Sequence, residues 1–147
     1  MTSLHLSSIH FYAILITALC TVATVLAHYE ALIALIIRGR SFSESGRRHI
    51  LTLVFGLLAS HLVGMAIFGV GIFALLQFPE AGFLSGASDE SLMECIYFAA
   101  ISYSTLGYGD VTPQGPVRLI ASITSLTGFM MITWSASATF LEMQRRW

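Results

Sequence analysis

Three long apolar runs constrain the fold of this chain more than any other feature. They cover residues 9–37, 50–76 and 117–141. Because a helix of about 20 apolar residues crosses the hydrocarbon core of a bilayer, each run is long enough to span a membrane. A fourth apolar run, residues 91–104, is too short to span, and such a helix is tolerated at membrane depth where protein surrounds it. The sequence therefore predicts an all-α membrane protein with three transmembrane helices and one re-entrant helix per chain.

The composition argues against several other classes of protein. Hydrophobic residues make up 56% of the chain and charged residues 10%, which is too apolar for a soluble globular domain. The net charge of −1 does not provide the basic surface that nucleic-acid binding needs, so we expect membrane lipids and no nucleic acid around the protein. The sequence shows neither a zinc-ligand spacing nor a nucleophilic triad. We therefore expect no enzymatic activity and no cofactor.

The arginines predict the orientation in the cell membrane. Six of the seven basic residues lie between the first two spans or after the third: Arg38, Arg40, Arg47, Arg48, Arg145 and Arg146. Basic residues accumulate on the cytoplasmic side of membrane proteins. This bias places the N-terminus outside the cell or in the periplasm and the C-terminus in the cytoplasm. The acidic segment 77–90 is then expected on the outer side.

A hexapeptide, Thr-Leu-Gly-Tyr-Gly-Asp at 105–110, joins the short apolar run to the third span. Gly107 and Gly109 tolerate positive φ, which a backbone that points all its carbonyls at one axis requires. The Thr105 hydroxyl can add an oxygen at the inner end, and we expect Tyr108 to pack outward. Asp110 makes the outer end negative. The hexapeptide resembles the selectivity filter of potassium channels, in which rings of backbone carbonyls replace the hydration shell of the ion.

From residue 50 onward the chain resembles the prokaryotic two-transmembrane potassium channels and the pore modules of voltage-gated channels. The resemblance implies an outer helix at 50–76, a turret at 77–90, a pore helix at 91–104, the filter at 105–110 and an inner helix at 116–142. Residues 1–49 would add an N-terminal transmembrane helix and a cytoplasmic loop, and small bacterial channel proteins with an extra leading helix resemble the whole chain. Such channels are homotetramers with K⁺ as the permeant ion. The residues expected to coordinate K⁺ through backbone carbonyls are Thr105, Leu106, Gly107 and Tyr108, and Gly109 completes the filter.

The same resemblance assigns supporting roles to other residues. Tyr97 and Phe98 match an aromatic pair on the pore helix, and the Tyr97 hydroxyl could hold Asp110. Ile101 stands where some members of the superfamily carry a glutamate behind the filter. Gly128 falls where the inner helix commonly has a hinge glycine, although a small residue that lets helices pack closely is an equal alternative.

Ionisable residues inside the spans form a separate candidate site. His28 and Glu30 lie in the first span and His61 in the second. The helical rise of about 1.5 Å per residue puts the two histidines at similar depth, with Glu30 about one turn closer to the cytoplasm. Because ionisable groups are costly in a membrane, we expect a structural polar cluster, a proton-sensitive latch, or a position that faces solvent or another subunit.

The remaining expectations concern connections and function. Residues 39–49 are predicted to form a loop, the turret to be irregular, and Ser88 or Asp89 to cap the pore helix. No span carries the arginines of a voltage sensor, and no cytosolic ligand domain is expected. The sequence therefore predicts a potassium-selective channel for passive K⁺ flux. Two alternatives stay open, a less selective monovalent cation channel and a non-conducting regulatory subunit of a transport complex.

Overall fold

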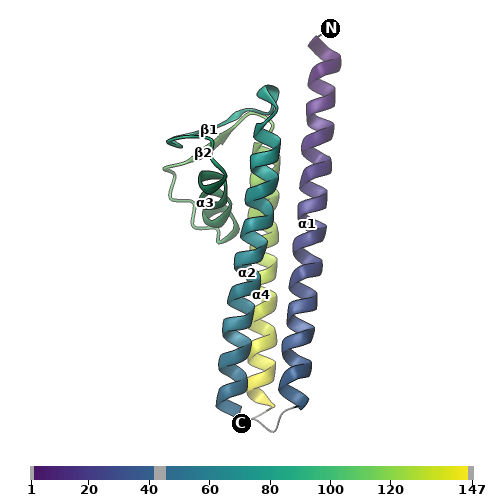
Figure 1. Ribbon diagram of the computed structural model, residues 1–147, viewed down its shortest axis with the longest axis vertical. Coiled ribbons are helices and arrows are strands. Elements are labelled where there is room, and N and C mark those ends of the chain that lie inside the picture. The colour runs from purple at the N-terminus through teal and green to yellow at the C-terminus, as the bar shows by residue number, and fades with distance from the viewer. Residues whose placement is uncertain (1, 42–45, 146–147) are drawn as a thin grey trace.

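The computed structural model describes residues 2–41 and 46–145 and consists of three long helices with a smaller unit at one side (Figure 1). The long helices are α1 (Thr2–Ser41), α2 (Gly46–Leu76) and α4 (Arg118–Gln144). Each contains an apolar segment long enough to cross a membrane, which confirms the three predicted spans. The smaller unit comprises η1 (Pro79–Ala81), β1 (Phe83–Ser85), the short helix α3 (Leu92–Tyr103) and β2 (Thr112–Gln114).

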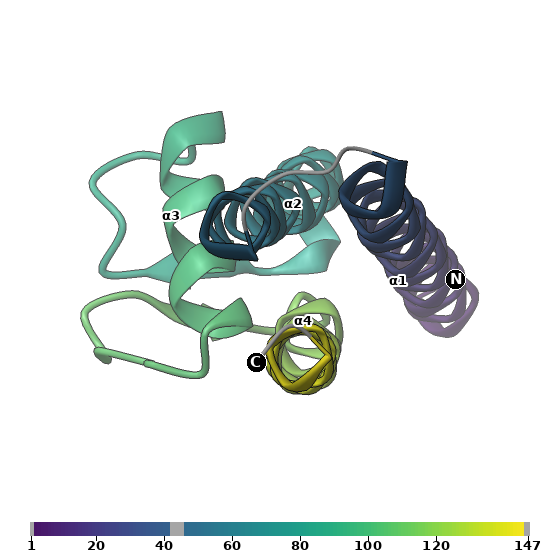
Figure 2. The ribbon, with the colours of Figure 1, turned by 90° about the horizontal axis from the view of Figure 1, so that it is seen from below.

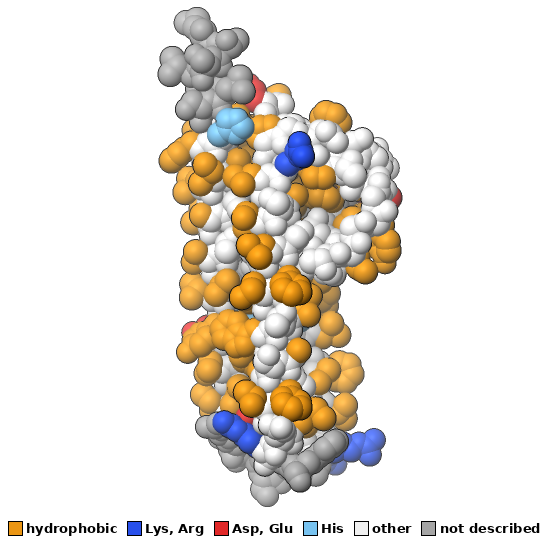
Figure 3. Space-filling view, turned by 180° about the vertical axis from the view of Figure 1, so that it is seen from behind, with side chains coloured by type: hydrophobic (Ala, Val, Ile, Leu, Met, Phe, Trp, Pro, Cys, Tyr) orange, Lys and Arg blue, Asp and Glu red, His pale blue; other side chains and the backbone are white. Residues whose placement is uncertain are grey.

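The helices α1 and α3 lie on opposite sides of the pair formed by α2 and α4 (Figure 2). Helix α1 packs on both members of that pair, and α3 packs on both from the other side. Apolar side chains are spread along the length of the face in view, whereas most charged side chains in view lie near its ends (Figure 3). This distribution suits a protein whose long faces contact lipid tails.

The prediction of a loop over residues 39–49 is wrong in extent. Helix α1 continues to Ser41 and α2 begins at Gly46, so most of that segment is helical. Arginine is a good helix former, and a helix that leaves the hydrocarbon core keeps its backbone hydrogen bonds. Polar composition therefore marked the edge of the apolar core and not the end of the helices.

The start of α3 also differs from the prediction. The N-cap is Ser91, whose hydroxyl accepts a hydrogen bond from the Glu94 N–H at 3.3 Å. The residues that were expected to cap the helix instead support this cap. Asp89 Oδ1 accepts from the Ser91 N–H at 3.2 Å, and Ser88 Oγ donates to Glu94 Oε1 at 3.1 Å.

The turret is not irregular throughout, because β1 pairs with β2 in an antiparallel ribbon across 83–85 and 112–114. Gly82 and Gly86 bracket β1 with φ of +101° and +91°. A Cβ on Gly86 would overlap the carbonyl oxygen of Asp110, so the end of β1 lies directly against the outer end of the hexapeptide. This contact needs a glycine both for its positive φ and for the space.

Candidate functional site

The backbone of the hexapeptide alternates in handedness. Thr105, Gly107 and Gly109 have φ of +59°, +53° and +83°, whereas Leu106 and Tyr108 are not among the described residues with positive φ. The glycines were expected to adopt this conformation, but Thr105 was not. A non-glycine residue in the left-handed region costs about 1–2 kcal/mol. Alternation of this kind turns successive N–H groups to one side of the strand and the carbonyls to the other.

Helix α3 holds the inner part of this loop through backbone hydrogen bonds. The Thr105 N–H donates to the Ser102 carbonyl at 2.9 Å, and the Gly107 N–H donates to the Ile101 carbonyl at 3.2 Å. Ile101 itself is buried in the core behind the loop. Ile101, which stands where some members of the superfamily carry a glutamate, therefore contacts the loop through its backbone carbonyl oxygen.

A side-chain hydrogen bond holds the outer end. The Tyr97 hydroxyl donates to Asp110 Oδ2 at 2.5 Å, which is one of the roles that the family resemblance implied for Tyr97. This bond lowers the pKa of the Asp110 carboxyl and raises the pKa of Tyr97 to about 12, because it stabilises the carboxylate and the protonated phenol together. Phe98, the other member of the aromatic pair, is buried beneath. The outer end of the loop therefore keeps a fixed negative charge.

The loop itself is uncovered in a single chain. Leu106 and Tyr108 are 60% and 68% exposed, although both are large and apolar. A Cβ on Gly107 or Gly109 would meet nothing within 4 Å. The expected outward packing of Tyr108 is thus not provided by its own chain.

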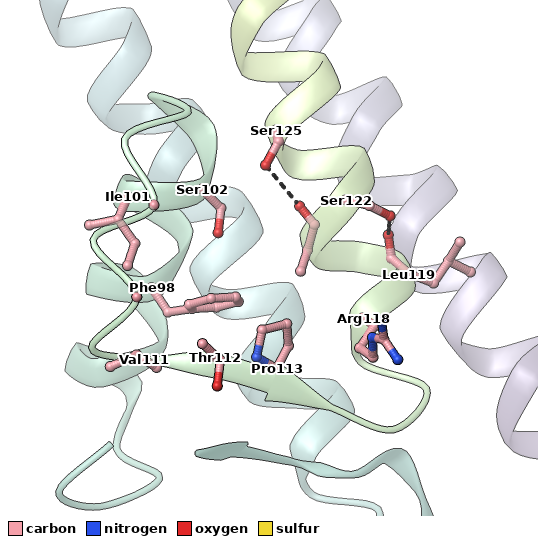
Figure 4. Close-up of a pocket in the computed structure, with 13 residues that line it drawn as sticks. Phe98, Ile101, Ser102, Val111, Thr112, Pro113, Arg118, Leu119, Ser122 and Ser125 are labelled. Carbon is pink, nitrogen blue, oxygen red and sulfur yellow. Dashed lines mark hydrogen bonds between the residues drawn. The ribbon is translucent and has the colours of Figure 1, made fainter. Parts of the chain in front are cut away.

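A cavity of about 620 Å³ lies between the loop, β2 and the start of α4 (Figure 4). Its wall includes Phe98, Ile101 and Arg118, with Ser122 and Ser125 on the α4 side. The two serine hydroxyls donate to carbonyls of their own helix, at 2.9 and 3.3 Å. The cavity therefore has a mixed polar and apolar lining and is large enough for a bulky side chain.

Gly128 lies where α4 passes the end of α3. A Cβ at this position would overlap the Tyr103 carbonyl oxygen and would lie 2.6 Å from the carbonyl carbon. The close-packing alternative therefore explains this glycine without a hinge, and the hinge stays a prediction.

The two intramembrane histidines meet as expected, with ring centroids 4.9 Å apart. Ser135 Oγ lies 3.0 Å from Nε2 of both His28 and His61. The remaining ring nitrogens also have hydroxyl partners, since Ser60 Oγ lies 3.0 Å from His28 Nδ1 and the Tyr103 hydroxyl lies 3.2 Å from His61 Nδ1. Sequence reasoning missed these three hydroxyl residues, although Ser60 precedes His61 and Tyr103 ends the pore-helix segment.

Glu30 does not belong to this cluster, which corrects the prediction. Its side chain is exposed on α1, while His28 is 1% exposed. Two residues along a helix correspond to a rotation of about 200°, so Glu30 and His28 lie on nearly opposite faces. The distance along the axis was too coarse a guide, because the face of the helix decides contact.

A second polar contact, not foreseen from the sequence, joins the lower ends of α2 and α4. His49 Nε2 lies 3.4 Å from Glu142 Oε2, and the two side chains are only 2% and 7% exposed. Arg145 Nη1 lies 3.1 Å from the other carboxylate oxygen. The sequence offered one signal for this contact, namely that His49 and Glu142 are polar residues near the ends of the second and third spans.

The comparison with protein families covers most of these elements. Residues 60–145, more than half of the chain, match the family model described as "Ion channel". The chain belongs to this ion-channel family. It is accordingly a multi-pass membrane protein with three candidate spans, and it is a channel protein and not an enzyme. Searches of curated proteins and of solved structures found no match.

Proposed function

We propose that the protein forms a potassium-selective channel from four copies of the chain and conducts K⁺ passively. The observation that carries this proposal is the alternating φ at Thr105, Gly107 and Gly109 within Thr-Leu-Gly-Tyr-Gly-Asp. Positive φ is uncommon outside glycine. Here it recurs at every second residue of the segment that resembles the potassium-channel filter. It suits a strand whose carbonyls all face one axis, which is how such filters dehydrate an ion.

The chemistry of the loop supports a cation as the permeant species. The carbonyls of Thr105, Leu106, Gly107 and Tyr108, with the Thr105 hydroxyl, are the proposed K⁺ ligands. Asp110 keeps negative charge at the outer end through its bond to Tyr97. The C-terminal end of α3 carries the partial negative charge of a helix terminus. Each of these features favours a cation and opposes an anion.

Exposure of the loop supports assembly around that axis. One chain supplies one filter strand, and a ring of carbonyls needs several strands. The large side chains of Leu106 and Tyr108 are exposed, and the cavity behind the loop is large enough for the aromatic ring of a tyrosine. In the proposed tetramer, Tyr108 of each neighbouring copy packs against this cavity and so fixes the diameter of the filter.

The proposed orientation places the filter mouth outside the cell. Strand β2, which closely follows Asp110, and the N-terminal end of α1 lie toward one end of the bundle (Figure 1). The start of α2, which carries the exposed Arg47, lies at the other end. The positive-inside rule then puts Arg47 in the cytoplasm and the N-terminus outside.

The decisive test is a reversal potential in liposomes that contain only this protein. With mainly K⁺ on one side and mainly Na⁺ on the other, a potassium channel shows a reversal potential near the K⁺ equilibrium potential. A less selective cation channel develops a potential near zero, and a non-conducting subunit passes no current. Either of the last two outcomes contradicts the proposal.

A substitution in the loop tests the residue assignment. Gly107→Ala places a Cβ on a residue with φ of +53°, which costs about 1–2 kcal/mol in each copy. We expect a loss of K⁺ selectivity from assembled protein, measured by reversal potential after cross-linking has verified the tetramer. The matched control is Gly56→Ala in α2, where the atoms nearest to a Cβ all belong to the Leu35 side chain, at 2.5–3.1 Å. Wild-type selectivity in an assembled Gly107→Ala tetramer would contradict the filter assignment.

A further inference from the structure

Five side chains form one continuous hydrogen-bonded chain across the middle of the bundle, in the order Ser60, His28, Ser135, His61, Tyr103. We refer to these residues as the polar chain. All four imidazole nitrogens have a hydroxyl oxygen at 3.0–3.2 Å. The polar chain joins α1 on one side of the α2–α4 pair to α3 on the other (Figure 2).

One end of the polar chain, Tyr103, lies at the inner end of the proposed filter. Tyr103 is the last residue of α3, is 0% exposed, and precedes Thr105 by two positions. Its carbonyl presses against Gly128, and its phenol reaches His61. Two contacts, one on the backbone and one on the ring, therefore fix the end of the pore helix at the point where the alternating backbone begins.

Toward its other end, the polar chain includes His28 of α1, a helix that lies outside the matched family segment. His28 is almost wholly buried between α2 and α4, and Ser60 and Ser135 hold its two ring nitrogens. Within the polar chain, the link from α1 to α3 passes through Ser135 and His61.

The number of donors and acceptors in the polar chain explains why the loss of His28 at one end affects the Tyr103 hydroxyl at the other. A neutral imidazole has one N–H donor and one acceptor nitrogen, so it passes the direction of donation along the chain. Among the described residues, the buried Tyr103 hydroxyl is hydrogen-bonded to His61 Nδ1 alone, and it is best satisfied when it donates to that nitrogen. His61 then donates to Ser135, Ser135 to His28 and His28 to Ser60. Without His28, Ser135 can donate to His61 instead, which leaves the phenol proton without an acceptor.

We propose that α1 is a positioning helix for the filter, and that His28 acts through Ser135 and His61 on Tyr103 to set the backbone at Thr105. The proposal rests on the proposed channel function and deepens it. His28 and His61 are positioning residues, since neither is expected to contact the ion. The charged and titratable groups near them do not provide an alternative link, because no Asp, Glu, Lys or Arg among the described side chains is hydrogen-bonded to either ring and Glu30 is exposed.

The test is a double-mutant cycle on two residues that do not touch each other. His28→Phe and Tyr103→Phe are made singly and together, and the K⁺ to Na⁺ permeability ratio and the steady K⁺ flux per tetramer are measured in liposomes. We expect each single variant to lower the flux, and the double variant to depart from the product of the single effects by at least about twofold. In a His61→Phe background the coupling should disappear, because the link is cut.

Control variants separate positioning from general packing. Tyr29→Phe removes a hydroxyl from the residue next to His28, and Thr17→Val removes a buried α1 hydroxyl that bonds only within its helix to the Ala13 carbonyl at 2.6 Å. Both should keep wild-type flux. His28→Gln retains a polar group near the Nε2 position and should recover part of the flux that His28→Phe loses.

The outcomes distinguish this inference from the function on which it rests. Independent effects of His28→Phe and Tyr103→Phe, in a wild-type background that conducts K⁺ selectively, overturn the positioning role alone. Equal losses in His28→Gln and His28→Phe, or losses in the controls, also overturn it, since they indicate packing. Absence of selective flux from the wild-type protein overturns the proposed function and this inference with it.

Discussion

Gly128→Ala tests the contact between α4 and Tyr103, at the inner end of the proposed filter. The new Cβ would lie 2.6 Å from the Tyr103 carbonyl carbon and 2.7 Å from its Cγ, whereas ordinary contacts begin near 3.4 Å. The carbonyl carbon must therefore retreat by about 0.8 Å, and the oxygen, which the Cβ overlaps, must retreat further. Overpacking of a core costs about 1–3 kcal/mol, and backbone obstruction puts this site at the upper end of that range. The better helix propensity of alanine returns only about 1 kcal/mol.

The assay compares the thermal melting of the purified assembly with K⁺ flux in liposomes. We expect Gly128→Ala to lower the melting temperature and to reduce flux, because α4 and Tyr103 must separate. The control is again Gly56→Ala, which gains the same helix propensity while its Cβ meets a side-chain end that can rotate away. A Gly128→Ala protein that melts higher than wild type and conducts normally would refute the close-packing argument. A higher melting temperature with altered opening would instead favour the hinge.

Three other predictions concern the mouth, the topology and the lower end of the bundle. Tyr97→Phe removes the donor that lowers the pKa of Asp110, so the carboxyl should take up a proton at higher pH, and inhibition of K⁺ flux by external acid should begin at higher pH than in wild type. His10→Cys should react with an impermeant thiol reagent from outside and Arg47→Cys only from the cytoplasmic side, and the reverse pattern would invert the proposed orientation. Glu142→Leu removes the carboxylate that lies against the buried His49 and should lower the melting temperature of the assembly, at a cost of about 1–3 kcal/mol; unchanged melting would contradict a structural role.

The sequence predicted those parts of the molecule that depend on composition or on a short specific motif. A membrane span needs only length and hydropathy, so the three long helices were evident. The positive φ of Gly107 and Gly109 followed from the residue type. The bond from Tyr97 to Asp110 followed from the family resemblance, since the two residues are 13 positions apart.

Features that depend on three-dimensional approach were not predictable in the same way. The pairing of β1 with β2 joins segments of three residues across the whole pore loop, and so short a strand has no periodicity to detect. Thr105 adopts a left-handed conformation that its residue type does not favour, because the structure on both sides imposes it. Glu30 was assigned by depth alone, and the helical face excluded it.

The two ends of the proposed filter are held by different parts of the chain. The outer end is held by neighbours within the pore segment, through the bond from Tyr97 to Asp110 and the close approach of Gly86. The inner end is held by Tyr103, whose ring depends on a chain of hydrogen bonds that reaches α1. Because the proposed filter strand is bound at both ends, we expect displacement of either end to change the spacing of its carbonyls. It follows that an added helix can influence conduction without approaching the ion, provided that it acts on the residue from which the filter strand begins.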